Sequence, residues 1–167
     1  MDTFWKWFFF GSGSRAGIRN ILNLYFIIHV FVAGFLTATI SLDPFAFASK
    51  ALFPAAAILI GMSMAWTTRA ATVMQSEDLR KKIFTKDRPA EDYVYGFQLA
   101  MLVVILMVVV VAIMAGGGLT LQLFGRETDR NISGYVMYLL LSISVRECWG
   151  VVNFTNMLSM LDYRRPE

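Results

Sequence analysis

Long apolar runs without charged side chains dominate the pattern of hydrophobic and polar positions along the chain. Charged residues are absent from residues 20–42, 51–68 and 93–125, and residues 131–161 contain only Arg146 and Glu147. A helix needs about 20 apolar residues to cross the hydrocarbon core of a bilayer. The pattern therefore predicts an all-α, polytopic membrane protein with four transmembrane helices, at about residues 20–41, 51–70, 93–115 and 134–158.

Two other fold classes explain this pattern poorly. The run from Tyr95 to Ala115 is apolar on every face, whereas a surface helix of a soluble protein keeps a polar face. A transmembrane strand would show about ten residues of alternating polarity instead of an unbroken run. The composition agrees with a membrane protein, because 57% of the residues are hydrophobic and only 16% are charged.

Prolines and glycines mark where the helices are expected to begin and end. Pro54 fits the first turn of the second helix, where its missing N–H does no harm. Pro89 fits the start of the third helix, and the glycines at 116–118 fit its end. In the loop 67–92, two acid–base pairs four residues apart favour a helix that continues to about Phe84.

The positions of lysine and arginine predict the orientation in the membrane. Eleven of the 15 lie before residue 20, in the loop 67–92 or in the tail, against three in the other loops. Because loops rich in these residues stay in the cytoplasm, we expect both ends of the chain on the cytoplasmic side (N-in/C-in). We expect the chain to be a multi-pass protein of a bacterial inner (plasma) membrane.

Three parts of the chain follow from this topology. Residues 1–19 are expected to form a cytoplasmic interfacial segment, residues 20–161 the four-helix transmembrane domain, and residues 162–167 a cytoplasmic tail. The loop 67–92 is the largest polar feature on the cytoplasmic side. Its charged residues are candidate contacts for a gating signal or a partner protein: Glu77, Asp78, Arg80, Lys81 and Lys82.

The chain opens with a dense aromatic stretch followed by Gly-Ser-Gly-Ser at residues 11–14. This stretch is too short to cross a membrane, and Trp and Phe prefer the boundary between headgroups and hydrocarbon. We therefore predict an interfacial segment along the inner leaflet, with Gly-Ser-Gly-Ser as a flexible elbow. The expected membrane anchors are Phe4, Trp5, Trp7, Phe8, Phe9 and Phe10.

The fourth apolar run carries the least expected side chains. A central Arg or acid costs about 2.5–3.5 kcal/mol if it faces lipid, so Arg146 and Glu147 must be shielded. Spacings of three or four residues place one stripe on this helix: Ser142, Arg146, Gly150, Asn153 and Asn156. Glu147 points about 100° away from the stripe, and His29 of the first helix is its hypothesised partner. Arg146 would then reach Glu147 of another copy or a water-filled axis.

Two roles are favoured over catalysis for these intramembrane polar residues. Polar side chains can simply hold transmembrane helices together, or they can line a path for an ion or a substrate. The regularly spaced small residues Ala57, Gly61 and Ala65 predict close helix packing as well.

The sequence lacks the patterns of common enzymes and metal sites. It contains no C-x-x-C, H-E-x-x-H, G-x-S-x-G or phosphate-binding glycine-rich loop. A single histidine cannot build a histidine-rich metal site, and Cys148 has no second cysteine with which to form a disulfide within the chain. We expect no catalytic activity, no cofactor, no metal and no nucleic-acid partner.

These features together favour an oligomeric membrane channel or pore-forming protein with the polar stripe nearest the axis. A membrane-permeabilising effector gated through the cytoplasmic loop would also fit. The alternative is a non-conducting accessory or assembly subunit that docks onto another membrane protein through the fourth helix. Expected partners are the lipid bilayer, further copies of the chain, and a membrane-protein or cytoplasmic partner at the loop 67–92.

Overall fold

The computed structural model describes residues 4–11, 17–40, 42–75, 90–117, 122–123, 126–127 and 130–163. Within these ranges the fold is all-helical, as predicted, except for one short hairpin. That hairpin pairs β1 (Gln122–Leu123) with β2 (Arg126–Glu127) in antiparallel register.

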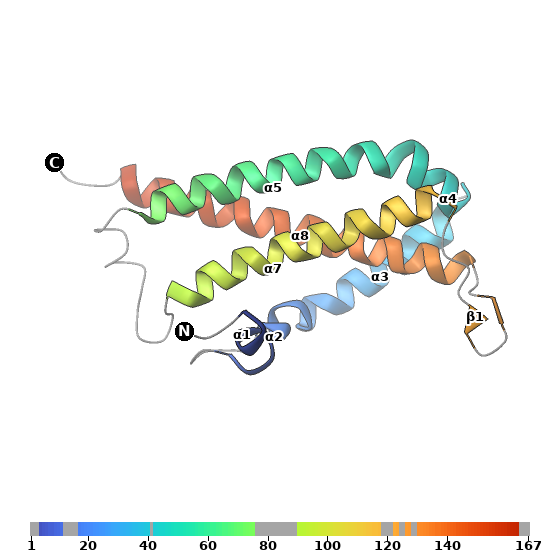
Figure 1. The fold of residues 1–167 in the computed structure, drawn as a ribbon, viewed down its shortest axis with the longest axis horizontal. Helices are drawn as coiled ribbons and strands as arrows, with labels where there is room; N and C mark the ends of the chain where they lie inside the picture. Colours follow the sequence, from blue (N-terminus) through green and yellow to red (C-terminus); the bar gives the residue numbers. More distant parts are fainter. Residues whose placement is uncertain are drawn as a thin grey trace.

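Three long helices form the body of the fold. They are α5 (Phe53–Met74), α7 (Ala90–Ala115) and α8 (Arg130–Tyr163), and they run side by side along the long axis of the molecule (Figure 1). The segments Pro44–Arg69, Asp92–Ala115 and Asn131–Met160 are each long and apolar enough to cross a membrane. Three of the four predicted spans therefore have the length and composition of membrane helices.

The first predicted span, residues 20–41, is interrupted in the structure. The short helix α2 (Ile18–Ile21) stops before Asn23, and α3 runs from Leu24 to Thr39. Asn23 is extended, and its side-chain amide donates a 3.1 Å hydrogen bond to the carbonyl oxygen of Asn20. This local bond competes with continued helix. The 16 residues of α3 cover about 24 Å, less than the roughly 30 Å hydrocarbon core, so the count of four spans stays a prediction.

The second helical segment begins before the predicted residue 51. It consists of α4 (Pro44–Phe47), the π-helical turn η1 (Ala48–Leu52) and α5, without a gap. The Asp43 carboxylate caps α4 by accepting a 3.4 Å hydrogen bond from the Ala46 N–H, and Pro44 occupies the first turn. Pro54 therefore lies inside a continuous helix instead of in its first turn. Pro54 has no N–H to donate. The π-helical turn lies directly before it, and there the Phe53 N–H donates to the carbonyl oxygen of Ala48, five residues earlier.

The helix α7 begins and ends close to the predicted positions. It starts directly after Pro89, and beyond its end Gly117 has a φ of +103°, in the region that favours glycine. The Gly117 N–H donates a 3.1 Å hydrogen bond to the Met114 carbonyl oxygen. The helix α8 is longer at both ends than the predicted 134–158.

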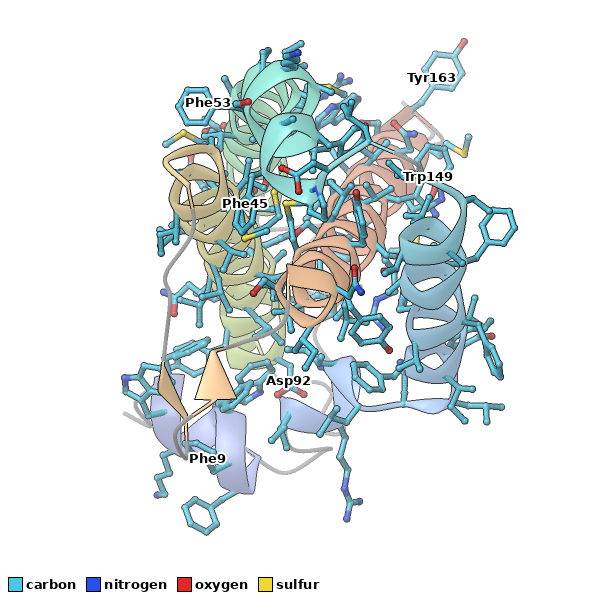
Figure 2. The ribbon with its side chains drawn as sticks, turned by 90° about the vertical axis from the view of Figure 1, so that its right-hand side faces the viewer. Phe9, Phe45, Phe53, Asp92, Trp149 and Tyr163 are labelled. Atoms are coloured by element: carbon cyan, nitrogen blue, oxygen red, sulfur yellow. The ribbon has the colours of Figure 1, made fainter. Side chains whose placement is uncertain are left out.

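Two clusters of buried side chains hold the helices together. The larger cluster joins α3, η1, α5, α7 and α8 and includes Ala33, Ala56, Met107, Val111 and Met137. The smaller one brings α1 (Phe4–Phe10) against α7 and α8, through Trp7, Leu99, Val103 and Ile143. Large apolar side chains cover much of the outer surface, and Figure 2 shows Phe9, Phe53 and Tyr163 projecting away from the helices. An apolar exterior of this kind is typical of a surface that faces lipid.

Candidate functional site

The polar residues of α8 meet α3 near the middle of both helices. The Nδ1 atom of His29 lies 2.7 Å from the hydroxyl oxygen of Ser142, within hydrogen-bond distance. The contact joins residues 113 positions apart in the sequence, and it fixes the face that α3 turns toward α8. Ser142 is thus the observed partner of His29.

Arg146 and Glu147 form an ion pair within the same helix. The Nε atom of Arg146 donates a 3.0 Å hydrogen bond to Oε1 of Glu147, and its Nη2 atom donates to the same oxygen. Nη2 also donates a 3.1 Å hydrogen bond to the carbonyl oxygen of Asn20. The side chains of Arg146 and Glu147 are only 22% and 18% exposed, so the pair is largely shielded.

These contacts correct the hypothesis of a His29–Glu147 pair. Matching depth alone suggested that pairing, but a long guanidinium group reaches the neighbouring carboxylate of its own helix, and a charged partner is the stronger one. Arg146 therefore does not need Glu147 of another copy. The Asn20 carbonyl is available to it because α2 stops there.

A cavity opens beside the ion pair, between α3 and α8. Its volume is about 410 Å³, and it is lined by Tyr25, Ile28, His29 and Arg146. The buried Nη1 atom of Arg146 has no hydrogen-bond acceptor among the described residues. The two N–H groups on this nitrogen are thus left for water or another molecule.

The rest of the predicted stripe lies on an open face of α8. Ser142 and Arg146 are partly covered, but Gly150, Asn153 and Asn156 are exposed. Trp149 on the same side is 64% exposed and is labelled in Figure 2. These residues therefore share one face of α8, but the described part of the chain covers only the end of that face with Ser142 and Arg146.

Glu147 lines a second cavity, between α7 and α8, that the sequence does not predict. The cavity has a volume of about 180 Å³. Its walls contain two carboxylates, three aromatic rings and two glycines: Asp92, Glu147, Tyr93, Phe97, Phe154, Gly96 and Gly150. Of these residues, the sequence pattern identifies Glu147 and Gly150 as members of the polar fourth run. The aromatic residues have no distinguishing pattern in the sequence, and only the packing of α7 beside α8 brings them together.

The aromatic N-terminal segment packs on the protein more than was expected. Trp7 is 1% exposed, and its indole Nε1 donates a 2.8 Å hydrogen bond to Oδ1 of Asp92 in α7. Figure 2 places Asp92 at the level of α1. The predicted anchors therefore divide in two: Trp7 is buried and Phe4 and Phe8 are partly buried, whereas the exposed anchors are Trp5, Phe9 and Phe10.

The remaining predicted features cannot be placed in this fold. Glu77, Asp78, Arg80, Lys81, Lys82 and most of the Gly-Ser-Gly-Ser elbow lie outside the described residues. Among the described residues, no group of three or more histidine, cysteine or acidic side chains could hold a metal ion. Cys148 in α8 is a half-buried free thiol.

Known proteins offer no guide to the function. No protein-family model, no curated protein and no solved structure matches this chain. The function therefore has to be argued from the polar face of α8 and the two cavities beside it.

Proposed function

We propose that the protein is a homo-oligomeric membrane channel in which the polar face of α8 lies nearest the conducting path. The observation that carries this proposal is the exposure of Gly150, Asn153 and Asn156 next to the partly shielded Arg146. Exposed amides are unfavourable against hydrocarbon, so water or another polar surface should cover this face. A second copy of the chain, or the lumen between copies, would supply that cover.

The proposal includes four spans with both ends in the cytoplasm. Helices α2 and α3 together extend from Ile18 to Thr39, and a short span can be accommodated by local thinning of the bilayer. Four spans place both ends on one side, in agreement with the excess of Lys and Arg there. The same distribution fits a bacterial inner membrane.

A stripe of small residues on α5 supports assembly with further copies. Ala57, Gly61 and Ala65 are all exposed, and no atom lies within 4 Å of a Cβ built on Gly61. The stripe is therefore not used for packing among the described helices. Stripes of this kind let helix backbones approach closely in membranes.

A non-conducting accessory subunit is the second candidate, and one observation favours it. Arg146 is paired with Glu147 inside the monomer, so the charges that would line a lumen are partly neutralised. In this case the exposed side of α8 around Trp149 would dock onto a different membrane protein.

Ion flux from liposomes, together with the oligomeric state of the purified protein, tests the channel. Flux that changes its ion preference in Arg146→Ala and Asn153→Leu supports it, because both residues belong to the polar face of α8. Phe35→Leu on the exposed side of α3 is the matched control and should leave the flux unchanged. If the purified protein is monomeric and conducts no ions, the channel proposal is wrong and the accessory-subunit proposal takes its place.

The cytoplasmic loop is the proposed gate of this channel. Charge reversal at Lys81 and Lys82 should shift the open fraction without changing ion preference, since the proposed conducting path follows α8. Equal open fractions for this variant and the unaltered chain would exclude a gating role for these lysines.

A further inference from the structure

The cavity between α7 and α8 exists because two glycines face it. Gly96 in α7 and Gly150 in α8 both line the cavity, and a Cβ atom built on either would have no neighbour within 4 Å. Two membrane helices with glycines at their contact usually pack closely, whereas here the space stays open. Its volume of about 180 Å³ exceeds the ~15 Å³ needed for one water but is below the ~300 Å³ of a drug-sized site. The cavity therefore suits a small ligand.

The charged groups in the cavity wall are carboxylates, which accept hydrogen bonds when ionised. Asp92 and Glu147 line it, and the described lining contains no basic side chain. Both hydrogen bonds from Arg146 go to Oε1 of Glu147, and among the described residues Oε2 accepts none. A carboxylate oxygen next to an open cavity favours a cation or a neutral donor and disfavours an anion.

The apolar part of the wall is aromatic. The rings of Tyr93 and Phe154 lie with their centroids 5.2 Å apart and their planes 29° apart, and the ring of Phe97 lies 5.5 Å from that of Phe154. Aromatic faces attract organic cations within about 6 Å of the ring centroid. A metal ion is a poorer match, because no cluster of three metal-ligating side chains is present among the described residues.

We infer that this cavity is a binding site for a small primary ammonium ion. The ammonium group would donate hydrogen bonds to the carboxylates of Asp92 and Glu147, and its carbon atoms would lie against Phe154 and its neighbours. A primary ammonium has three N–H donors, whereas a quaternary ammonium has none. The ion can come from free amine or from the ethanolamine headgroup of a phospholipid, since Gly150 at the cavity is exposed. This site does not depend on whether the protein conducts ions.

Saturation-transfer NMR with ethylammonium chloride on the purified protein in detergent tests the site. The double variant Gly96→Ala/Gly150→Ala fills the cavity without a steric clash and should abolish the transfer. The matched control Gly34→Ala also replaces a helical glycine with open surroundings, but away from the cavity, and should bind as the unaltered chain does. Phe154→Leu should weaken binding roughly fivefold, as expected for the loss of one cation–π contact.

Tetramethylammonium chloride and lipid nanodiscs complete the test. Tetramethylammonium has the same charge but no N–H, and it should give little transfer. If phosphatidylethanolamine stabilises the protein against heat more than phosphatidylglycerol does, and the cavity-filling variant loses that difference, the ligand is the lipid headgroup. Ethylammonium binding without such a lipid effect assigns the site to free amine. Equal transfer in the unaltered chain and the cavity-filling variant, or no transfer together with no lipid effect, overturns the inference.

Discussion

At the scale of single residues, the contacts of Arg146 show how a charge is accommodated in an apolar helix. Its guanidinium bonds to Glu147 of the same helix and to the carbonyl oxygen of Asn20. That carbonyl is accessible because Asn23 interrupts the helix that would otherwise use it. The break in the first apolar run thus provides a hydrogen-bond acceptor for the arginine in the fourth run. A pattern of residue types cannot reveal such a coupling.

A double-mutant cycle on the ion pair checks this account. Arg146→Ala and Glu147→Gln should each lower the free energy of unfolding by about 1–3 kcal/mol, because each leaves a shielded polar group without its partner. The double variant should cost about 0.5–3 kcal/mol less than the sum of the single variants. Denaturant unfolding in mixed micelles measures all four proteins. Strict additivity would mean that the pair contributes nothing in solution.

Gly17 offers a second residue-scale prediction. A Cβ atom on Gly17 would lie 2.3 Å from the ring of the buried Trp7, so Gly17→Ala should lower the free energy of unfolding by about 1–3 kcal/mol through overpacking. Gly34→Ala, where no atom lies within 4 Å, is the control. It should keep or slightly raise stability, because alanine favours helix over glycine by up to about 1 kcal/mol. Thermal unfolding of both variants in the same detergent gives the comparison.

At the scale of elements, the helix bounds depend on local signals, and the positions of the helices depend on packing. The bounds of α7 follow from Pro89 and the glycines near residue 116. The start of α4 follows from Asp43 and Pro44, although length alone placed the helix later. The docking of α1 is different in kind, because its aromatic residues fit a lipid boundary equally well. Trp7 turns inward because α7 offers Asp92 as a hydrogen-bond acceptor and apolar contacts at Leu99 and Val103.

Substitution of Trp7 tests whether α1 is held by α7. Trp7→Phe removes the indole donor and the five-membered ring but keeps a six-membered aromatic ring, and should cost about 1–3 kcal/mol. Trp7→Ala removes the whole ring system and should cost about 3–5 kcal/mol because it leaves a larger cavity. In hydrogen exchange, the amides of α1 should lose protection in Trp7→Ala while those of α5 keep it. A uniform loss of protection across both helices would contradict a separately docked α1.

At the scale of the whole molecule, the number of times the chain crosses the bilayer depends on α3. Three helical segments have the length and composition to do so, and the 16-residue α3 decides between three and four crossings. An even number returns the end of the chain to the side where it began, and an odd number does not. The side on which each end lies therefore reports directly on α3.

Cysteine labelling measures that topology. In a Cys148→Ser background, which removes the single cysteine of the chain, the exposed positions Phe10, Ile132 and Tyr163 are replaced by cysteine one at a time. Four spans predict that a membrane-impermeant maleimide reaches Phe10→Cys and Tyr163→Cys only from the cytoplasmic side and Ile132→Cys only from outside. If Phe10→Cys and Tyr163→Cys react from opposite sides, α3 does not cross.

The sequence by itself determined that the chain is helical and that its long helices are apolar enough to cross a membrane. Uncharged apolar runs of about 20 residues can satisfy their backbone only as helix in a bilayer, and proline and glycine end such helices for local reasons. The same runs carry no information on which faces meet, because they are apolar on every side. Only the tertiary structure decided that His29 pairs with Ser142, that Arg146 pairs with Glu147, and that Asp92 receives Trp7. The first and third contacts join residues from separate helices, and the second depends on the direction in which the long Arg146 side chain extends. Packing of the helices selects all three.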